Sequence, residues 1–155
     1  MGCTRVNNMG YPLWWDTTLT LYNKYVDPQT QIVSWFRTVL ENCFWKATGS
    51  IAVVNDVALD TEGVICRIPK DDTFLEKYAW VELPNDQMSE YFTLGTGDII
   101  IKGDVPDEIN EYQKGHRSTD LLAKYKDLRG CIEIQEISIN TGVARNEEHY
   151  WVRGK

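Results

Sequence analysis

The sequence contains few of the residues from which catalytic and metal sites are usually built. It has only two histidines and four cysteines among its 155 residues. No two cysteines have Cys-x-x-Cys spacing, and no histidine lies at ligand spacing beside a cysteine. We therefore expect no metal ion and no cofactor, and we expect the cysteines to be reduced and structural.

Long hydrophobic runs are also missing. No stretch approaches the roughly 18 consecutive apolar residues that a membrane-spanning helix needs. The first residues, Met-Gly-Cys-Thr-Arg-Val-Asn-Asn, lack the apolar core of a signal peptide. We expect no membrane partner and synthesis in the cytoplasm of the cell that makes the protein.

Basic residues are outnumbered by acidic ones. Sixteen Lys and Arg against 23 Asp and Glu give a formal net charge of −7. A polyanion such as DNA is repelled by most of such a surface. Tight, direct binding of nucleic acid is therefore disfavoured.

Three short motifs resemble functional sites but lack what those sites need. Gly95-Thr96-Gly97 is followed by neither Gly-Lys-Ser/Thr nor a helix that could bind phosphate. The acidic stretch from Asp104 to Glu111 lacks the alternating ligands and central glycine of a calcium loop. His116 to Asp120 offers a base, a hydroxyl and an acid, but these neighbours cannot converge if Ser118 caps a helix. We expect no enzymatic activity.

Aromatic residues are abundant, with six Trp and eight Tyr. We therefore expect large aromatic side chains to supply much of the buried surface, in a folded core, on aromatic-rich surfaces or against a partner. His149, next to Tyr150 and Trp151, is interpreted as a cross-strand pair rather than a ligand.

The stretch from Tyr91 to Val105 predicts the central strand. Ile99 to Ile101 are β-branched and are bounded by glycines on both sides, as in a short buried strand between tight turns. Asp98, directly before this run, is predicted to accept backbone N–H groups and hold the turn.

Similar patterns predict the other elements. A hairpin is expected from a strand beginning at Thr17 and a long strand over Ile32–Trp45, joined at Asp27–Thr30, with a bulge or bend at Glu41-Asn42. A change of parity within Cys131–Ile139 predicts a bulge near Gln135. A helical turn is predicted within Pro84–Phe92 and one helix from Ser118 to about Asp127, with a long exposed loop over Asp104–Arg117. The two residues Gly154-Lys155 are expected to be free. The remaining strands are predicted at Ile51–Val54, Val57–Leu59, Val64–Ile68, Tyr78–Leu83 and His149–Val152.

Together these elements predict an all-β, mainly antiparallel fold. We expect a small β-barrel or sandwich of about seven to nine strands, with one short helix and long loops. Residues 1–16 are interpreted as an N-terminal arm and residues 17–155 as a single domain.

Five segments of the sequence resemble a family of small proteins encoded in the structural-gene regions of tailed phages and prophages. The resemblance spans nearly the whole chain, and the pattern is similar to that of neck proteins, which are minor capsid or head-closure proteins. In those proteins a Phe, a Gly-Asp strand and a following Gly occur in a β-barrel, and here they would be Phe92, Gly97, Asp98 and Gly103. The five segments are Trp15–Thr18, Asn42–Lys46, Ile65–Pro69, Gly97–Gly103 and His149–Gly154.

This resemblance implies a head-tail connector or head-closure (stopper) subunit that packs in a ring against copies of itself. Its loops would reach the portal-side adaptor and the tail proteins. It would be made in the cytoplasm of the bacterial host and reside in the neck of the virion. DNA would pass nearby without specific binding, which agrees with the acidic composition.

Eight residues are candidates for the assembly interface, each with self-packing as the alternative. Two rival functions stay open: a tail terminator or other tail-proximal virion subunit, and a ligand- or carbohydrate-binding β-domain that uses surface aromatics. The interface candidates are Trp14, Trp15, Phe74, Leu75, Asp107, Glu108, Glu111 and Arg117.

Overall fold

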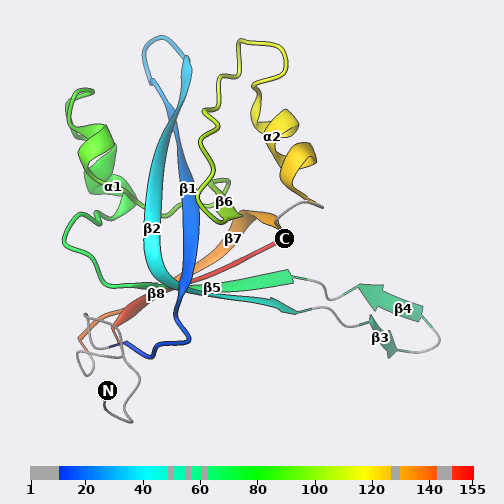
Figure 1. Ribbon diagram of the computed structural model, residues 1–155. Helices are drawn as coiled ribbons and strands as arrows, with labels where there is room; N and C mark the ends of the chain where they lie inside the picture. The colour runs from blue at the N-terminus through cyan, green and yellow to red at the C-terminus, as the bar shows by residue number, and fades with distance from the viewer. Residues whose placement is uncertain (1–10, 49–50, 55–56, 61–62, 127–129, 143–147) are drawn as a thin grey trace.

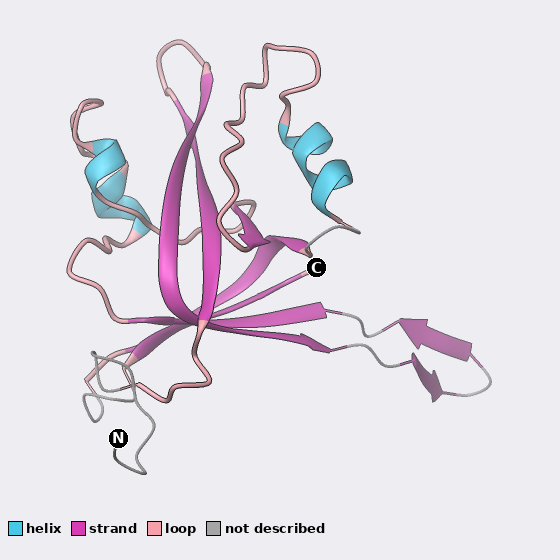
Figure 2. Ribbon diagram, viewed as in Figure 1, coloured by secondary structure: helices cyan, strands magenta, loops and turns pink. Residues whose placement is uncertain are grey.

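Figure 1 shows the computed structural model of the chain, in which residues 11–48, 51–54, 57–60, 63–126, 130–142 and 148–155 are described. At residues 48, 51–54 and 57–60 the structure describes the backbone alone. The fold is mainly antiparallel β-structure (Figure 2), as the sequence predicted.

Six strands close into a barrel in the order β1-β2-β5-β8-β7-β6, and β3 and β4 form a separate two-stranded ribbon. In Figure 1 this ribbon continues beyond the ends of β2 and β5, away from the barrel. The strands are β1 (Thr17–Val26), β2 (Val33–Thr48), β3 (Ile51–Val54), β4 (Val57–Asp60), β5 (Gly63–Pro69), β6 (Ile99–Lys102), β7 (Cys131–Asn140) and β8 (His149–Gly154).

The predicted hairpin of β1 and β2 is confirmed, including its bend. The pairing shifts register where Thr17 lies opposite Cys43 but Leu19 lies opposite Leu40. At this point Asn42 has a φ of 58°, a left-handed conformation that Asn adopts more readily than most residues. The bend lets β2 pair with β1 along its first half and with β5 from Phe44 onward.

The predicted central strand is confirmed as β6, which closes the barrel between β1 and β7. Asp98 precedes it and is 1% exposed. Its carboxylate accepts hydrogen bonds from the backbone N–H of Gly95 (2.9 Å) and Lys24 (3.0 Å) and from Nδ2 of Asn23 (2.8 Å). The side chain therefore holds the turn, as predicted.

The bulge predicted near Gln135 is also confirmed, because the pairing of β7 with β8 shifts between Ile134 and Glu136. The prediction of a free Gly154-Lys155 is wrong. Gly154 is buried in β8, and Lys155 exchanges two backbone hydrogen bonds with Glu133, each 3.3 Å long. A methyl group at Gly154 would lie 2.4 Å from the carbonyl oxygen of Glu133, so only glycine allows this close approach.

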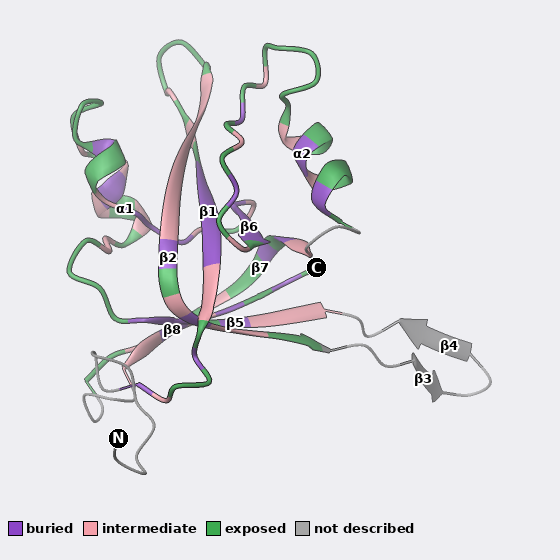
Figure 3. Ribbon diagram, viewed as in Figure 1, coloured by how far each residue is buried: buried purple, intermediate pink, exposed green. Residues whose placement is uncertain are grey.

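Side chains are buried on both faces of β1 (Figure 3). Leu19 and Leu21 point into the barrel with Ile100 of β6. Tyr22 points to the other face, where it packs with Ile99 and other residues in a second cluster, here called the outer cluster. Each of these large apolar side chains contributes roughly 1.5–3 kcal/mol on burial. The outer cluster is covered by the chain between β6 and β7.

The strand predicted at Tyr78–Leu83 is wrong, because this region contains the short helix α1 (Lys77–Trp80). Trp80 is fully buried and meets Tyr25 and Phe36 edge-on, with ring centroids 6.1 and 5.5 Å apart. Its Nε1–H donates to the backbone oxygen of Met88 at 3.2 Å. Contacts from distant segments therefore decide this conformation, since no strand pairs with these residues in the described chain.

The two other helical predictions are confirmed. A short 3-10 helix, Met88–Glu90, lies in the predicted turn, and α2 (Ser118–Tyr125) is the predicted longer helix. Its cap differs from the prediction. Arg117, not Ser118, is the N-cap residue, and the carboxylate of Asp120 accepts the backbone N–H of Arg117 at 3.1 Å. Ser118 is the first helical residue.

Candidate functional site

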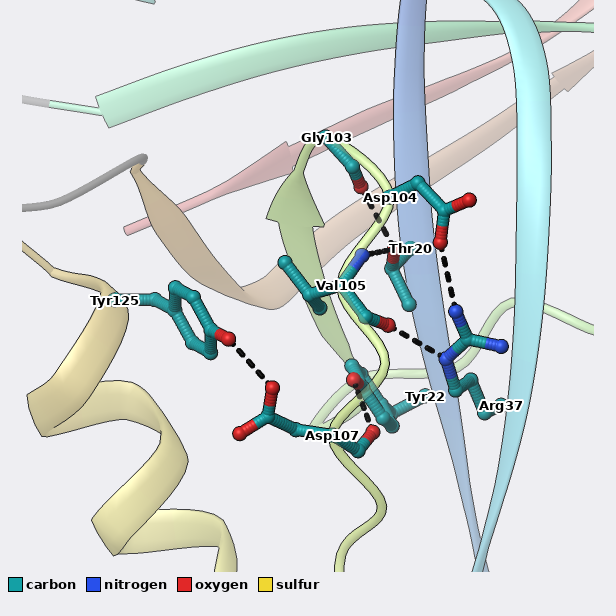
Figure 4. A network of polar contacts seen from close by, with 8 residues as sticks. All are labelled: Thr20, Tyr22, Arg37, Gly103, Asp104, Val105, Asp107 and Tyr125. Atoms are coloured by element: carbon teal, nitrogen blue, oxygen red, sulfur yellow. Dashed lines mark hydrogen bonds and ion pairs between the residues drawn. The ribbon is translucent and has the colours of Figure 1, made fainter.

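Residues 104–117, here called the strap, run from the end of β6 along the β1–β2 hairpin (Figure 4). The prediction of an exposed loop is wrong for part of this segment. Val105 is 1% exposed and Ile109 is 7% exposed, and both belong to the outer cluster. The segment is irregular, as predicted, but it packs on the hairpin instead of standing free.

Four hydrogen bonds join Gly103 and the start of the strap to the middle of the hairpin. The hydroxyl of Thr20 donates to the backbone oxygen of Gly103 at 2.7 Å and accepts the N–H of Val105 at 3.1 Å. Arg37 of β2 donates Nε–H to the oxygen of Val105 at 2.7 Å. Its other arm forms an ion pair with Asp104 at 2.8 Å. Figure 4 shows these bonds side by side.

Asp107 joins the strap to both the hairpin and α2. The hydroxyl of Tyr22 donates to its backbone oxygen at 2.6 Å, while its carboxylate accepts Nζ of Lys124 at 2.8 Å and the hydroxyl of Tyr125 at 2.5 Å. The bonds from Lys124 and Tyr125 lower the pKa of Asp107. Burial raises the pKa of Tyr22, so its hydroxyl stays a donor.

The end of the strap is held in the same way. Oε1 of Glu111 accepts the indole N–H of Trp35 at 3.1 Å and the backbone N–H of Ser118 at 2.9 Å. Burial alone would raise the pKa of Glu111, but the hydrogen bonds from Ser118 and Trp35 lower it overall. The hydroxyl of Tyr112 accepts the backbone N–H of Val33 near the hairpin tip at 2.9 Å.

The four strap residues predicted for an interface therefore divide into two kinds. Asp107 and Glu111 are partly buried and bind groups of their own chain. Glu108 and Arg117 are exposed. A partner that touched the strap would meet the second pair directly, whereas the first pair fixes the strap in place.

The two adjacent tryptophans differ in their exposure. Trp15 is 6% exposed and stacks on Tyr11 at 5.0 Å, with His149 edge-on at 5.7 Å. Trp14 is 66% exposed, next to the exposed Leu13. Trp15 thus packs on the barrel, and Trp14 presents an indole to the surroundings.

Phe74 and Leu75 lie close to the core. The ring of Phe74 stacks on Tyr150 with centroids 4.1 Å apart and meets Phe92 at 5.6 Å. The backbone N–H of Leu75 donates to the oxygen of Phe92 at 2.9 Å. Both side chains are partly buried, and that of Phe74 packs against the barrel core.

Sequence reasoning missed an apolar surface at the tip of the β1–β2 hairpin. Val26 and Ile32 flank the turn with exposed fractions of 41% and 51%, and Tyr112 of the strap is 63% exposed. The signal was present, since Val26 and Ile32 bracket a polar turn with no obvious partner. Tyr78 of α1 is a further exposed aromatic, at 72%.

The described residues offer few groups suited to metal binding or nucleophilic chemistry. Within the described ranges, no cluster of His, Cys, Asp and Glu is suited to a metal ion. Cys43 and Cys66 are fully buried, and this burial raises the pKa of both thiols, which disfavours the nucleophilic thiolate. The ring of His149 lies 3.2 Å from Nδ2 of Asn140, the cross-strand pairing expected for it.

Three open pockets lie around the hairpin. One of about 520 Å³ is lined by residues that include Lys24, Lys77 and Asp98. Burial raises the pKa of Asp98, partly offset by Lys77 and by the hydrogen bonds described above. The other two pockets, of about 360 and 310 Å³, lie beside β2.

Among the described residues, no helix has the length and apolar character needed to cross a membrane.

Comparison with known proteins places the chain in a family. A search of the curated proteins and a search of the solved structures each found no match. A family model, described as a family of unknown function (DUF6751), matches residues 14–155. This range covers every strand and helix of the structure. The chain therefore belongs to the DUF6751 family.

Proposed function

We propose that this protein is a structural, non-enzymatic subunit of a tailed-phage virion. In this proposal it is a head-closure (stopper) or connector subunit that forms a ring with copies of itself in the neck. The observation that carries the proposal is a barrel filled by its own side chains, from which the β1–β2 hairpin and the β3–β4 ribbon extend. Extended elements of this kind suit contacts between subunits.

The positions that carry the phage resemblance have structural roles in the barrel. Gly97 and Gly103 have φ values of 93° and 101°, which favour glycine. Asp98 between them holds the start of β6, and Phe92 is buried in the core. The resemblance therefore rests on residues that specify the fold, which supports a shared barrel.

Two apolar surfaces lie at opposite ends of the molecule. Leu13 and Trp14 precede β1 at one end, and Val26, Ile32 and Tyr112 lie at the hairpin tip at the other. Exposed apolar groups on two sides allow one subunit to contact two neighbours. Such head-to-tail contacts close into rings when the rotation permits.

The net charge of −7 suits a subunit beside a DNA channel. An acidic surface lets DNA pass without being held. The proposed partners are copies of this chain, the portal or adaptor on the head side, and the tail proteins. The proposed location is the virion neck, after synthesis in the cytoplasm of the bacterial host.

Co-sedimentation with the portal–adaptor complex encoded by the same genome tests the proposal. The full chain is expected to sediment with that complex, and Trp14→Ser is expected to weaken the association because it removes an exposed indole. Tyr78→Ser is the matched control, since Tyr78 is equally exposed but lies on α1, outside both apolar surfaces. Failure of the unmodified chain to associate in any order of addition contradicts the neck role.

The rival functions are distinguished by related measurements. A tail terminator would bind purified tails and not the portal complex. A carbohydrate-binding domain would use exposed aromatics that line a cleft. The exposed rings of Trp14, Tyr78 and Tyr112 line none of the three pockets described above, so no observation favours that alternative.

A further inference from the structure

The change of partner along β2 leaves one of its edges without a partner strand, although the 3-10 helix Met88–Glu90 lies close to β2. From Val33 to Leu40 it pairs with β1, and from Phe44 to Thr48 it pairs with β5 across its other edge. Over Val33–Leu40, the edge that faces away from β1 pairs with no strand in the described part of the chain. This edge is here called the outer edge of β2.

The hydrogen-bond register decides which backbone groups point outward. The N–H of Asp27 donates to the oxygen of Ile32, so Val33 and every second residue after it direct their N–H and C=O away from β1. The N–H of Val33 accordingly reaches Tyr112. The next three outward-facing residues are Trp35, Arg37 and Val39, and their backbone groups make no hydrogen bond with any other described residue.

Open pockets lie at both ends of this edge. The pocket of about 360 Å³ is lined by Val39, Glu41 and Asp71 among others. The pocket of about 310 Å³, near the hairpin tip, includes Asp27 and Phe36 in its lining. The seven residues from Val33 to Val39 span about 20 Å, enough for a short strand whose ends would reach both pockets.

The negative charge of the residues that line these pockets indicates which kind of strand could bind at the outer edge. Their ionisable lining residues, tyrosine apart, are Asp27, Glu41 and Asp71, and neither pocket is lined by a basic residue. A second copy of β2 would bring the same acids together. Like charges at such short range disfavour pairing between copies.

We propose that the outer edge of β2 accepts an extended segment of a different protein as an added strand. The segment carries basic side chains that alternate with apolar ones. Its backbone pairs with Trp35, Arg37 and Val39, and its basic groups lie near Glu41, Asp71 and Asp27. Added strands gain affinity from backbone hydrogen bonds and specificity from side-chain pockets. The inference goes beyond the neck role and holds independently of it.

Amide hydrogen exchange of the isolated full chain, measured by NMR, tests whether the edge is open. Amides of Trp35, Arg37 and Val39 are expected to exchange quickly, whereas Phe36 and Thr38, which face β1, are protected. Fast exchange should persist at high protein concentration. Protection that rises with concentration would assign the edge to a second copy. Protection at every concentration would mean that the chain covers its own edge, and either result overturns the proposal.

Binding is tested with the peptide Lys-Val-Lys-Val-Lys-Val-Lys as the probe. It is expected to slow exchange at Trp35, Arg37 and Val39. Glu-Val-Glu-Val-Glu-Val-Glu, which has the opposite charge, and Lys-Pro-Lys-Pro-Lys-Val-Lys, which cannot pair as a strand, are expected to leave those amides unchanged. Equal protection by all three peptides, or none by the first, overturns the proposal.

Two variants test the geometry and the charge separately. Val39→Pro removes an outward N–H without removing a bond to β1, so it should abolish peptide protection while leaving the remaining amide spectrum unchanged. Because this variant could unfold, Glu41→Lys combined with Asp71→Lys provides a second test at exposed positions. The double variant should weaken peptide binding about tenfold at low salt, and an unchanged affinity contradicts the charge selection.

Discussion

Asp98 ties the turn before β6 to β1 through one carboxylate. It accepts hydrogen bonds from Gly95 in its own turn and from Asn23 and Lys24 of β1. Asn23 in turn exchanges two hydrogen bonds with the backbone of Thr93. A single buried side chain thus sets the position of β6 against β1 and of the segment that leads to it.

Replacing Asp98 with alanine removes the acceptor for three donors, the buried Nδ2 of Asn23 and the partly buried N–H groups of Lys24 and Gly95. We expect Asp98→Ala to lower the free energy of unfolding by about 2–4 kcal/mol, because buried donors without partners cost more than the bond itself contributes. Urea-induced unfolding followed by tryptophan fluorescence measures the change. Asp72→Ala, at an exposed position, should shift stability by less than about 0.5 kcal/mol. Similar values for the two variants would remove Asp98 from this role.

The ion pair of Asp107 with Lys124 predicts a pH dependence. The pKa of Asp107 is lowered in the folded chain, so its contribution is fully present above the unfolded value of about 3.9 and disappears as the pH falls through the folded value. Asp107→Asn should therefore cost about 1–2 kcal/mol near neutral pH and much less in acid. Urea unfolding at several pH values measures this difference.

Glu108→Gln is the control for that experiment, since Glu108 is the exposed neighbour of Asp107. Its effect should be small at every pH. A deficit of Asp107→Asn that stays constant from neutral to strongly acidic pH would show that the carboxylate charge does not stabilise the strap.

At the scale of elements, the bend of β2 determines the shape of the barrel and opens its outer edge. Asn42 adopts its left-handed conformation at the bend. A β-branched residue there is strained by about 1–2 kcal/mol. We expect Asn42→Val to destabilise the fold by this amount and Asn42→Gly to be neutral or slightly stabilising, as measured by thermal unfolding. Equal melting temperatures for the two variants would mean that the bend does not depend on this backbone conformation.

Local patterns in the sequence were sufficient for most elements. Each of three signals lies within a few consecutive residues. The isoleucines predicted β6, the parity change predicted the bulge in β7, and the polar break predicted the bend in β2. The conformation of α1 could not, because Trp80 is held by Tyr25 and Phe36 from another part of the chain. Short amphipathic segments are decided by such distant contacts.

The same limit applies to the candidate site. The acidic residues of the strap were predicted to lie in an exposed loop because their partners, Tyr22, Trp35 and Tyr125, belong to other segments of the chain. The exposed Trp14 and the buried Trp15 could be named as a pair but not distinguished. The outer edge of β2 depends on which strands pair, and this is a property of the closed barrel.

At the scale of the whole molecule, the charge of −7 and the filled barrel agree with a protein that acts through its surfaces. The DUF6751 family model matches residues 14–155, a range that includes the barrel, the strap and the ribbon. The extended hairpin and ribbon, the two apolar ends and the open edge of β2 together provide several separate contact surfaces.

The acidic surface predicts negligible affinity for DNA. We expect the dissociation constant for a random 30-base-pair duplex at physiological salt to be weaker than about 10⁻⁴ M, the weak end of non-specific binding. Fluorescence anisotropy of labelled duplex measures it, and a lysozyme-like basic protein serves as the positive control. Micromolar binding would contradict the passive passage of DNA that the net charge of −7 suggests.

The most direct test of the assembly role is a cryo-EM reconstruction of the neck in particles of a phage that encodes this chain. The proposal predicts copies of the six-stranded barrel in a closed ring between portal and tail, with β3–β4 ribbons or hairpin tips contacting neighbouring subunits. A complete neck built from other proteins, with no barrel of this topology in the particle, would contradict it.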